Sequence, residues 1–146
     1  MPSVRGCNLP DDLLYDVDNH IWFREVGDGN VKIGMTAVAT AMSGKLVAFT
    51  PKRVGRSVRA GKSCGTLESG KWVGPAKSAA GGEVVEVNDA MVNEPSIAND
   101  DPYEAGWLLI LKPEEWDSVK GTLVAGSDVT APYEAKMDAE GFGGCA

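Results

Sequence analysis

The chain has 146 residues, of which 43% are hydrophobic and 24% are charged. This length predicts one domain, and the apolar content suffices for a core, which excludes a disordered polypeptide. The net charge of −7 argues against nucleic acid as a partner, because binding a phosphate backbone needs clustered Lys and Arg. It fits a protein that meets basic patches on its partners.

The sequence also limits where the protein can work. No apolar run approaches the roughly 20 residues of a membrane span, and the first residues lack a hydrophobic signal core. We therefore expect a cytoplasmic protein with no membrane partner. The three cysteines, Cys7, Cys64 and Cys145, are odd in number and lack a Cys-x-x-Cys spacing, which indicates neither a disulfide framework nor a zinc site. Cys64 is interpreted as a buried core residue, and Cys7 and Cys145 as free thiols, with a terminal pairing left open.

The first half of the chain contains clear turn and cap signals. The turn sequence of residues 27–30 predicts a β-hairpin, and Thr36 and Gly44 can begin and end a short helix. The predicted elements are a loose lead-in over 1–14, hairpin strands over 21–26 and 31–35, a helix over 37–42 and a strand over 45–50 that Pro51 stops.

The second half alternates strands with short helices. Within the strand at 82–88, the alternation places Val85 and Val87 inward and leaves Val84 out of phase. Pro113 and the acids after it predict a helix start. The remaining elements are a strand over 63–69, a helical segment over 89–98 interrupted by Pro95, a strand over 106–111, and a helix around 133–139 followed by a flexible end.

We divide the chain into a lead-in (1–14), one domain (15–126) and a tail (127–146). Within the domain, residues 64–75 place a single lysine, Lys71, between a glycine and a tryptophan, with a Gly-Pro breaker following. Gly and Pro punctuate turns, so Lys71 is predicted at the tip of a hairpin. An exposed lysine usually has no role beyond contact with solvent. The sequence on both sides of Lys71 argues that this lysine has a function.

The block from about residue 19 to 113 resembles the H protein of the glycine cleavage system. The order and spacing of the matching pieces make the resemblance specific. These pieces are His20-x-Trp22, Gly34-Met-Thr, Gly65-Thr-Leu-Glu-Ser-Gly-Lys71, Gly82-Glu-Val-Val-Glu-Val-Asn88, Pro95, Asn99-Asp-Asp-Pro-Tyr103 and Gly106-Trp-Leu108.

The resemblance implies a mainly β fold. This fold is a flattened β-barrel/sandwich hybrid of two similar halves, with short peripheral helices and a C-terminal helix. A weak internal echo between Gly44-Lys-Leu-Val and Gly82-Glu-Val-Val agrees with two similar halves.

The resemblance also implies a carrier protein, not an enzyme. In this family, lipoic acid is attached by an amide to the lysine that corresponds to Lys71. Gly65, Glu68 and Ser69 correspond to the residues that the lipoate-attaching enzyme reads. We expect that enzyme as one partner and the enzymes that use the lipoyl arm as the others.

The residues around Lys71 depart from the usual glycine-cleavage pattern. Those proteins usually have a small apolar residue before the lysine and a small residue after it, whereas this chain has Gly70 and Trp72, and Trp72 can contact the arm. These changes resemble the lipoate-binding proteins of heterodisulfide-reductase-like sulfur oxidation, whose arm shuttles sulfur-bound intermediates, and we favour this role. The alternatives are an H protein that carries an aminomethyl group in glycine cleavage, and an unlipoylated interaction module. A biotin carrier is disfavoured because a Met-Lys-Met tip is absent.

Other polar and aromatic residues are given structural interpretations. His20 has no nucleophile beside it in the sequence and is expected to be structural. Trp22, Trp107 and Trp116 are expected in the core, and no metal site is predicted, since the acids at 99–101 lack the spacing of a calcium loop. A small basic cluster, Lys52-Arg53 with Arg56, is interpreted as a solvated loop, with partner docking as the alternative.

Overall fold

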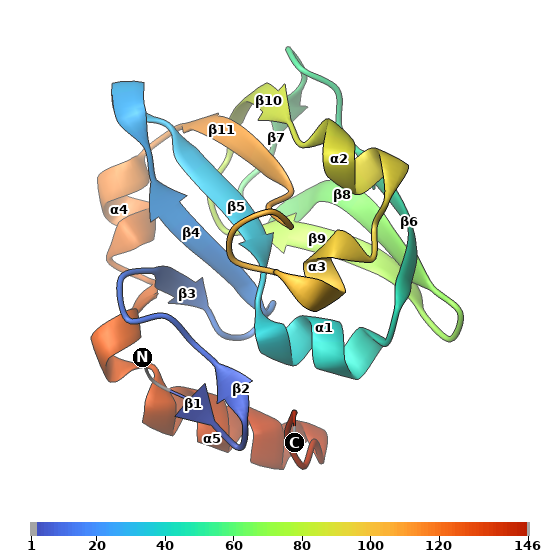
Figure 1. Ribbon diagram of the computed structural model, residues 1–146. Coiled ribbons are helices and arrows are strands. Elements are labelled where there is room, and N and C mark those ends of the chain that lie inside the picture. The colour runs from blue at the N-terminus through green and yellow to red at the C-terminus, as the bar shows by residue number, and fades with distance from the viewer. Residues whose placement is uncertain (1–2, 146) are drawn as a thin grey trace.

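The computed structural model describes residues 3–145, which form three antiparallel sheets and short helices (Figure 1). The largest sheet has seven strands in the spatial order β12-β3-β4-β5-β11-β10-β7. These strands are β3 (Leu14–Asp16), β4 (Ile21–Glu25), β5 (Val31–Met35), β7 (Ser57–Val58), β10 (Gly82–Val87), β11 (Leu109–Pro113) and β12 (Val124–Ala125).

The second sheet has three strands, β6 (Leu46–Pro51), β8 (Lys62–Ser69) and β9 (Val73–Ser78), with β8 in the centre. A two-stranded ribbon joins β1 (Ser3–Val4) to β2 (Cys7–Asn8). The helices are α1 (Ala37–Ser43), α2 (Asp89–Asn93), α3 (Ile97–Asp100), α4 (Trp116–Lys120) and α5 (Thr130–Glu140), with 3-10 turns η1 (Gly27–Gly29) and η2 (Gly126–Asp128). None of these helices is long and apolar enough to cross a membrane.

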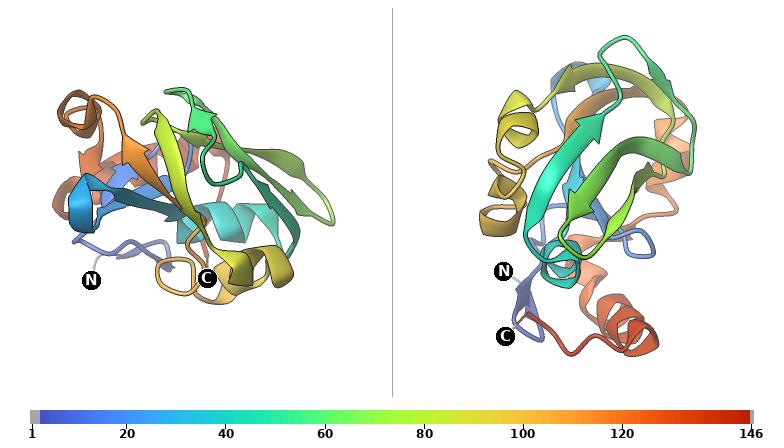
Figure 2. Two further views of the ribbon diagram at one scale, coloured as in Figure 1. Left: turned by 90° about the horizontal axis from the view of Figure 1, so that it is seen from above. Right: turned by 90° about the vertical axis from the view of Figure 1, so that its right-hand side faces the viewer.

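The main core lies between the two larger sheets, which face each other in the views of Figure 2. Phe23 and Leu109 project from the seven-stranded sheet, and Phe49 and Leu67 project from the three-stranded sheet; all four are buried in one cluster. Burying two apolar sheet faces against each other is the main favourable contribution to such a fold. The mainly β sandwich-like fold expected from the sequence is confirmed.

The local signals of the first half are confirmed. Strands β4 and β5 pair across η1, and helix α1 begins after Thr36, whose side chain accepts a hydrogen bond from the Ala39 N–H. The helix ends at Gly44, which has a φ of 75°, a conformation that favours glycine. This short helix connects the end of β5 to the start of β6.

Of the two valines of strand β10 that were predicted to face inward, Val87 is confirmed and Val85 is wrong, because Val84 takes the inward position. A register shift between Val84 and Glu86 marks a β-bulge, so Val84 is fully buried and Val85 is only half-buried. The extra residue in a bulge reverses the alternation that follows it, and Val87 therefore packs against the same core as Val84.

The predicted helix start at Pro113 is also wrong. Pro113 is the last residue of β11, opposite Gly82. Helix α4 begins at Trp116, after Glu115 has turned the chain with a left-handed φ of 50°. Trp116 packs on the core as expected.

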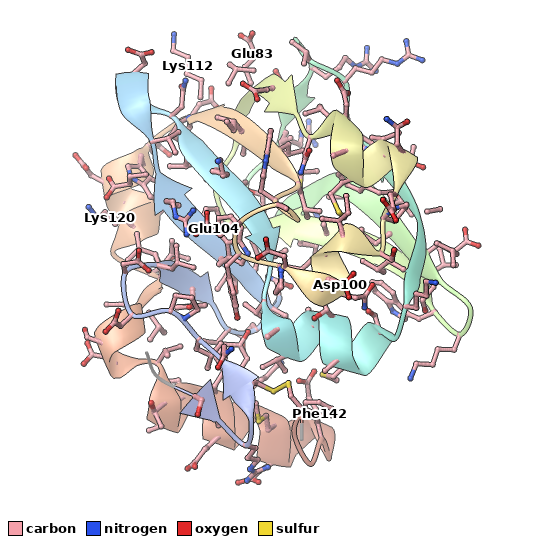
Figure 3. The ribbon with its side chains drawn as sticks, viewed as in Figure 1. Glu83, Asp100, Glu104, Lys112, Lys120 and Phe142 are labelled. Carbon is pink, nitrogen blue, oxygen red and sulfur yellow. A yellow bond between two sulfur atoms is a disulfide. The ribbon has the colours of Figure 1, made fainter. Side chains whose placement is uncertain are left out.

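The two ends of the described chain are tied together, which contradicts the expected loose lead-in and flexible end. Cys7 and Cys145 form a disulfide (Figure 3), so the interpretation of both as free thiols is wrong. Tyr133 and Met137 of α5 are fully buried in a second apolar cluster, which also contains Leu9. This cluster lies against the side of β4 that faces away from the main core, where Trp22 is buried.

Candidate functional site

Lys71 lies at the tip of the hairpin formed by β8 and β9, as the sequence predicts. Glu68 pairs with Val73 at the last step of the ladder. The turn is closed by the Ser69 N–H, which donates to the Trp72 carbonyl at 2.7 Å. The Lys71 N–H donates to the Ser69 hydroxyl at 3.3 Å. The tip projects past the end of α1 (Figure 1), and the ladder fixes the position of the Lys71 backbone.

The Lys71 side chain is exposed and its amine forms no ion pair within residues 3–145. It lies over Gly44, where an added Cβ would come within 3.1 Å of Lys71 Cε and 3.7 Å of Nζ. Gly44 ends helix α1, and the carbonyl end of a helix favours a nearby cation. The amine is therefore lightly held and open to another protein.

The three residues expected to guide lipoate attachment differ in access. Glu68 is exposed and can be read directly by an enzyme. Ser69 is only 5% exposed, and its hydroxyl shapes the turn. Gly65 is buried between β6 and β9, where a Cβ would come within 3.1 Å of Phe49 and of the backbone of residues 50 and 51. Gly65 thus permits close strand packing, and Glu68 is the member of the set that presents a side chain.

Trp72 folds back from the tip onto its own strand. A Cβ added at Gly74 would come within 2.4 Å of the indole Cζ2 atom, which shows that the ring lies directly against Gly74. The indole is 38% exposed, so most of it is covered. The large residue after Lys71 is accommodated because the residue two positions later has no side chain.

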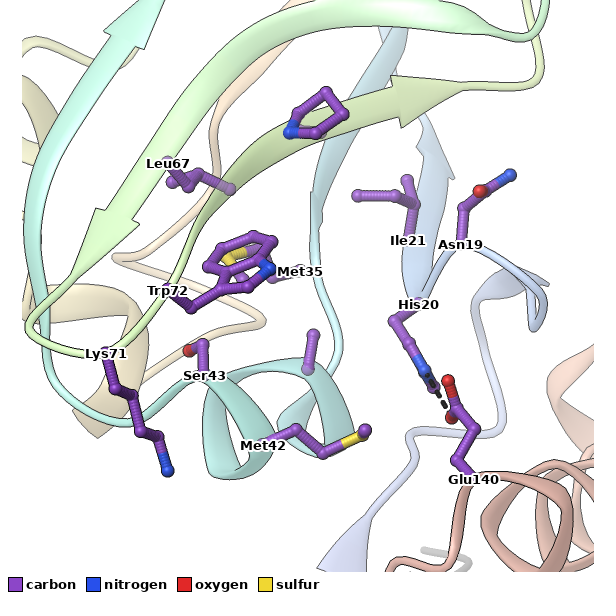
Figure 4. A pocket seen from close by; sticks show the side chains of 13 residues that line it. Asn19, His20, Ile21, Met35, Met42, Ser43, Leu67, Lys71, Trp72 and Glu140 are labelled. Carbon is purple, nitrogen blue, oxygen red and sulfur yellow. Dashed lines mark hydrogen bonds and ion pairs between the residues drawn. The ribbon is translucent and has the colours of Figure 1, made fainter.

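A groove of about 510 Å³ begins at the tip and runs across the body (Figure 4). It is formed by β4, β5 and α1, which follow one another in the chain, together with the β8–β9 hairpin and the end of α5. Most of its lining is apolar, as suits a small-molecule site. The lining residues are Asn19, His20, Ile21, Met35, Ala39, Met42, Ser43, Leu67, Lys71, Trp72, Pro75, Ala76 and Glu140.

The end of the groove farthest from Lys71 in Figure 4 holds a histidine–carboxylate pair. His20 Nε2 lies 2.8 Å from Glu140 Oε1, and His20 Nδ1 lies 3.1 Å from the Tyr133 hydroxyl. The imidazole also stacks on the Tyr133 ring. Burial lowers the pKa of His20, and Glu140 opposes this shift in part. These contacts are consistent with the expected structural role of His20. The imidazole also lines the groove.

The thiol of Cys64, inside the hairpin, is expected to be unreactive. Cys64 is fully buried in β8, and burial raises the pKa of its thiol to about 12. A thiol in that state supplies almost no thiolate for exchange, which agrees with its interpretation as a core residue. Within residues 3–145, no cluster of His, Cys, Asp or Glu could hold a metal ion.

The sequence singled out Lys71, Trp72 and His20 but gave no sign that they share a groove. Met42 and Glu140 carry no motif, and they reach this groove only because α1 and α5 approach the hairpin. The helix spacing of Tyr133 and Met137 could have indicated that α5 packs on the body. Nothing in the sequence indicated that Glu140 would lie beside His20.

The fold and the site define a class of protein: a β scaffold that presents one exposed lysine on a rigid hairpin tip beside an apolar groove. The family model described as "Glycine cleavage H-protein" matches residues 13–136, which is most of the chain. The chain belongs to the glycine cleavage H-protein family, and the family resemblance seen in the sequence is confirmed.

Individual relatives agree with this assignment. The "Glycine cleavage system H protein 5" of Aquifex aeolicus is 50% identical over 128 residues, covering 85% of this chain and 86% of that protein. The "Probable glycine cleavage system H protein 2" of Sulfurisphaera tokodaii is 34% identical over 142 residues, covering 96% and 95%. The crystal structure of a glycine cleavage system H protein from Mycobacterium marinum matches with a TM-score of 0.69 and 37% identity, covering 81% of this chain and 93% of that one.

Proposed function

We propose that the protein is a lipoyl carrier that bears lipoic acid on Lys71 and has no catalytic turnover of its own. The observation that carries the proposal is the exposed amine of Lys71, at the tip of a rigid hairpin in an H-protein fold, which has no ion-pair partner among the described residues 3–145. We place its work in the cytoplasm, where the enzymes that attach and use lipoate would meet it.

The residues around Lys71 fit a lipoyl group. The amine is accessible for amide formation, which removes its positive charge, and Met42 and Trp72 line an apolar path that starts at Lys71. When attached, lipoate supplies a dithiolane whose thiol–disulfide exchange can take up and release a group on sulfur. The chain itself contributes position: the turn at Ser69 fixes where the tether starts, and Trp72 covers part of the groove beside it.

The attaching enzyme would recognise the tip by shape and by one charge. We propose that Glu68 is read directly, because it is exposed next to the turn. Gly65 and Ser69 act indirectly, since Gly65 lets the strands pack closely and Ser69 fixes the Lys71 backbone.

We propose glycine cleavage as the system served, with the arm carrying an aminomethyl group between the enzymes of that system. The names of the relatives support this role, since the proteins from Aquifex aeolicus and Sulfurisphaera tokodaii and the structure from Mycobacterium marinum are all named as glycine cleavage H proteins. The preference for sulfur oxidation drawn from the sequence has no support in these names.

We retain a second candidate, heterodisulfide-reductase-like sulfur oxidation, in which the arm carries sulfur-bound intermediates. The reason is the large residue, Trp72, at the hairpin tip. The indole of Trp72 against Gly74 gives partner enzymes a different surface from that of a tip with small residues. In addition, relatives numbered 5, 2 and 3 come from the single organism Aquifex aeolicus. One glycine cleavage system needs one H protein, so several copies suggest carriers for other enzymes.

The experiment on lipoylation uses protein made in a lipoylation-competent host. Intact mass and peptide mapping should show one lipoyl group on Lys71, and the Lys71→Arg variant should stay folded and unmodified. Lys45→Arg is the matched control, because Lys45 is also exposed near the tip end of the sheet, and it should be modified like the wild type. A folded wild-type protein that is never modified would instead support the unlipoylated interaction module.

A second experiment separates the two systems. The lipoylated protein is incubated with glycine, glycine decarboxylase, aminomethyltransferase and tetrahydrofolate as the acceptor of the one-carbon unit, and the ammonia released in a single turnover, which leaves the arm as a dithiol, is measured. Ammonia release that requires Lys71 supports glycine cleavage. Modified protein that is inactive with those enzymes, and active with heterodisulfide-reductase-like subunits, supports sulfur oxidation.

A further inference from the structure

Positive charge is strongly segregated along this acidic chain. Residues 29–67 contain seven of its fourteen Lys and Arg residues and none of its twenty-one Asp and Glu residues. A random distribution of charges would place several acids in a stretch of this length. The segregation therefore points to a surface whose function requires positive charge and would be weakened by acidic residues.

Five of these cations lie within residues 52–62, the segment that leads from the end of β6 through β7 to the start of β8, and we name them the basic edge. All five are exposed, and none forms an ion pair within residues 3–145. By contrast, Arg24, Lys120 and Lys136 elsewhere each pair with an acid. The basic edge consists of Lys52, Arg53, Arg56, Arg59 and Lys62.

The backbone beneath the basic edge is anchored. The Lys52 N–H donates to the Cys64 carbonyl at 3.0 Å, and Gly55 and Arg56 exchange hydrogen bonds with Val84 of β10 at 2.8 and 2.9 Å. A surface held in this way loses little conformational entropy when a partner binds.

The basic edge also has an apolar centre. Val54 is 60% exposed between Arg53 and Arg56, and these residues line a hollow of about 460 Å³ with Pro51 and Lys52. Arginine side chains around a small apolar contact are typical of protein interfaces. Glu83 lies opposite Ser57 in the sheet and forms no ion pair within residues 3–145, and its single negative charge offsets only part of the charge of the five cations.

The basic edge lies at the opposite end of the hairpin from Lys71. Strand β8 starts at Lys62 and ends beside the tip, and its eight residues span roughly 25 Å. Figures 1 and 2 show the β7 edge and the hairpin tip on opposite sides of the three-stranded sheet. A protein held at the basic edge thus leaves Lys71 free to reach another active site.

We propose that the basic edge is a docking surface for an acidic patch on a partner enzyme, separate from the surface used at the tip. A polyanion such as nucleic acid fits less well, because the net charge of −7 repels it at long range, whereas a local acidic patch meets mainly the basic edge. The docking proposal borrows one point from the proposed function, namely that the partner is an enzyme that uses the Lys71 arm. Docking itself needs no lipoyl group.

Photo-crosslinking tests the contact directly. The full-length variant Val54→p-benzoylphenylalanine is expressed in the native host and irradiated, and the product is identified by mass spectrometry. An adduct with one acidic enzyme subunit, formed equally when Lys71→Arg is added, supports the proposal. No adduct, a nuclease-sensitive adduct or an adduct with a second copy of the chain overturns it. Lys71→Arg removes the proposed lipoyl site. Failure of the carrier function would therefore leave the adduct in place, whereas failure of docking would abolish it.

The affinity of the purified pair supplies a matched control. Arg56→Glu reverses a charge in the basic edge, and Lys45→Glu makes the same change in charge at the tip end of the sheet. We expect Arg56→Glu to weaken binding roughly tenfold, and raised salt to weaken the wild-type complex. Lys45→Glu should change binding by less than about twofold. Equal losses in both variants would show that only net charge matters and would overturn the docking surface.

Discussion

Breaking the disulfide between Cys7 and Cys145 is expected to remove about 5 kcal/mol of stability. The bond spans a sequence separation of 138 residues, and the chain-entropy account gives about 4.7 kcal/mol for a loop of 100 residues, rising slowly with length. The neighbouring Arg5–Asp138 ion pair is partly exposed and contributes no more than about 1 kcal/mol. The disulfide is therefore expected to contribute more than this ion pair to holding the two ends together.

Urea unfolding of the oxidised and reduced wild type, followed by tryptophan fluorescence, measures this contribution. Reduction should lower the free energy of unfolding by about 5 kcal/mol, and the Cys145→Ser variant should match the reduced protein and ignore the reductant. A loss below about 1 kcal/mol would refute the reasoning, because the ends would then be held by packing alone.

Three further predictions concern single residues near the groove and the second apolar cluster. Gly74→Ala should displace the Trp72 indole, because the new Cβ would come within 2.4 Å of it; a red shift of Trp72 fluorescence at a cost of about 1–3 kcal/mol is expected, and unchanged emission would contradict the packing. Gly34→Ala places a Cβ 2.3 Å from buried Trp22, so thermal denaturation should show a loss of about 3 kcal/mol. The lowered pKa of His20 means that the unfolded chain binds the proton more tightly, so stability should fall as pH drops below about 6.5. His20→Asn should reduce the difference in unfolding free energy between pH 7.5 and 5.5, and an unchanged difference would count against burial of the imidazole.

Features that depend on neighbouring residues could be predicted from the sequence. The turn after β4, the Thr36 cap and the Gly44 end of α1 each rest on local backbone chemistry. The same is true of Lys71, whose place at the tip follows from the glycines and proline around it. The resemblance to H proteins then supplied the fold, which local signals alone could not have determined.

Features that depend on distant residues could not be predicted. The pairing of Cys7 with Cys145 joins opposite ends of the chain, and spacing alone does not determine connectivity. The bulge in β10 inserts one residue and reverses the expected phase of Val84 and Val85 without any glycine to mark it. The groove required α5 to bring Glu140 to His20, a contact across 120 residues.

The most direct measurement is the mass of the Lys71 peptide in protein isolated from its native host under conditions in which the partner enzymes are expressed. The carrier account predicts that this peptide bears one lipoyl amide, and that the peptide containing exposed Lys45 bears none. An unmodified Lys71 in folded protein from those cells would contradict it.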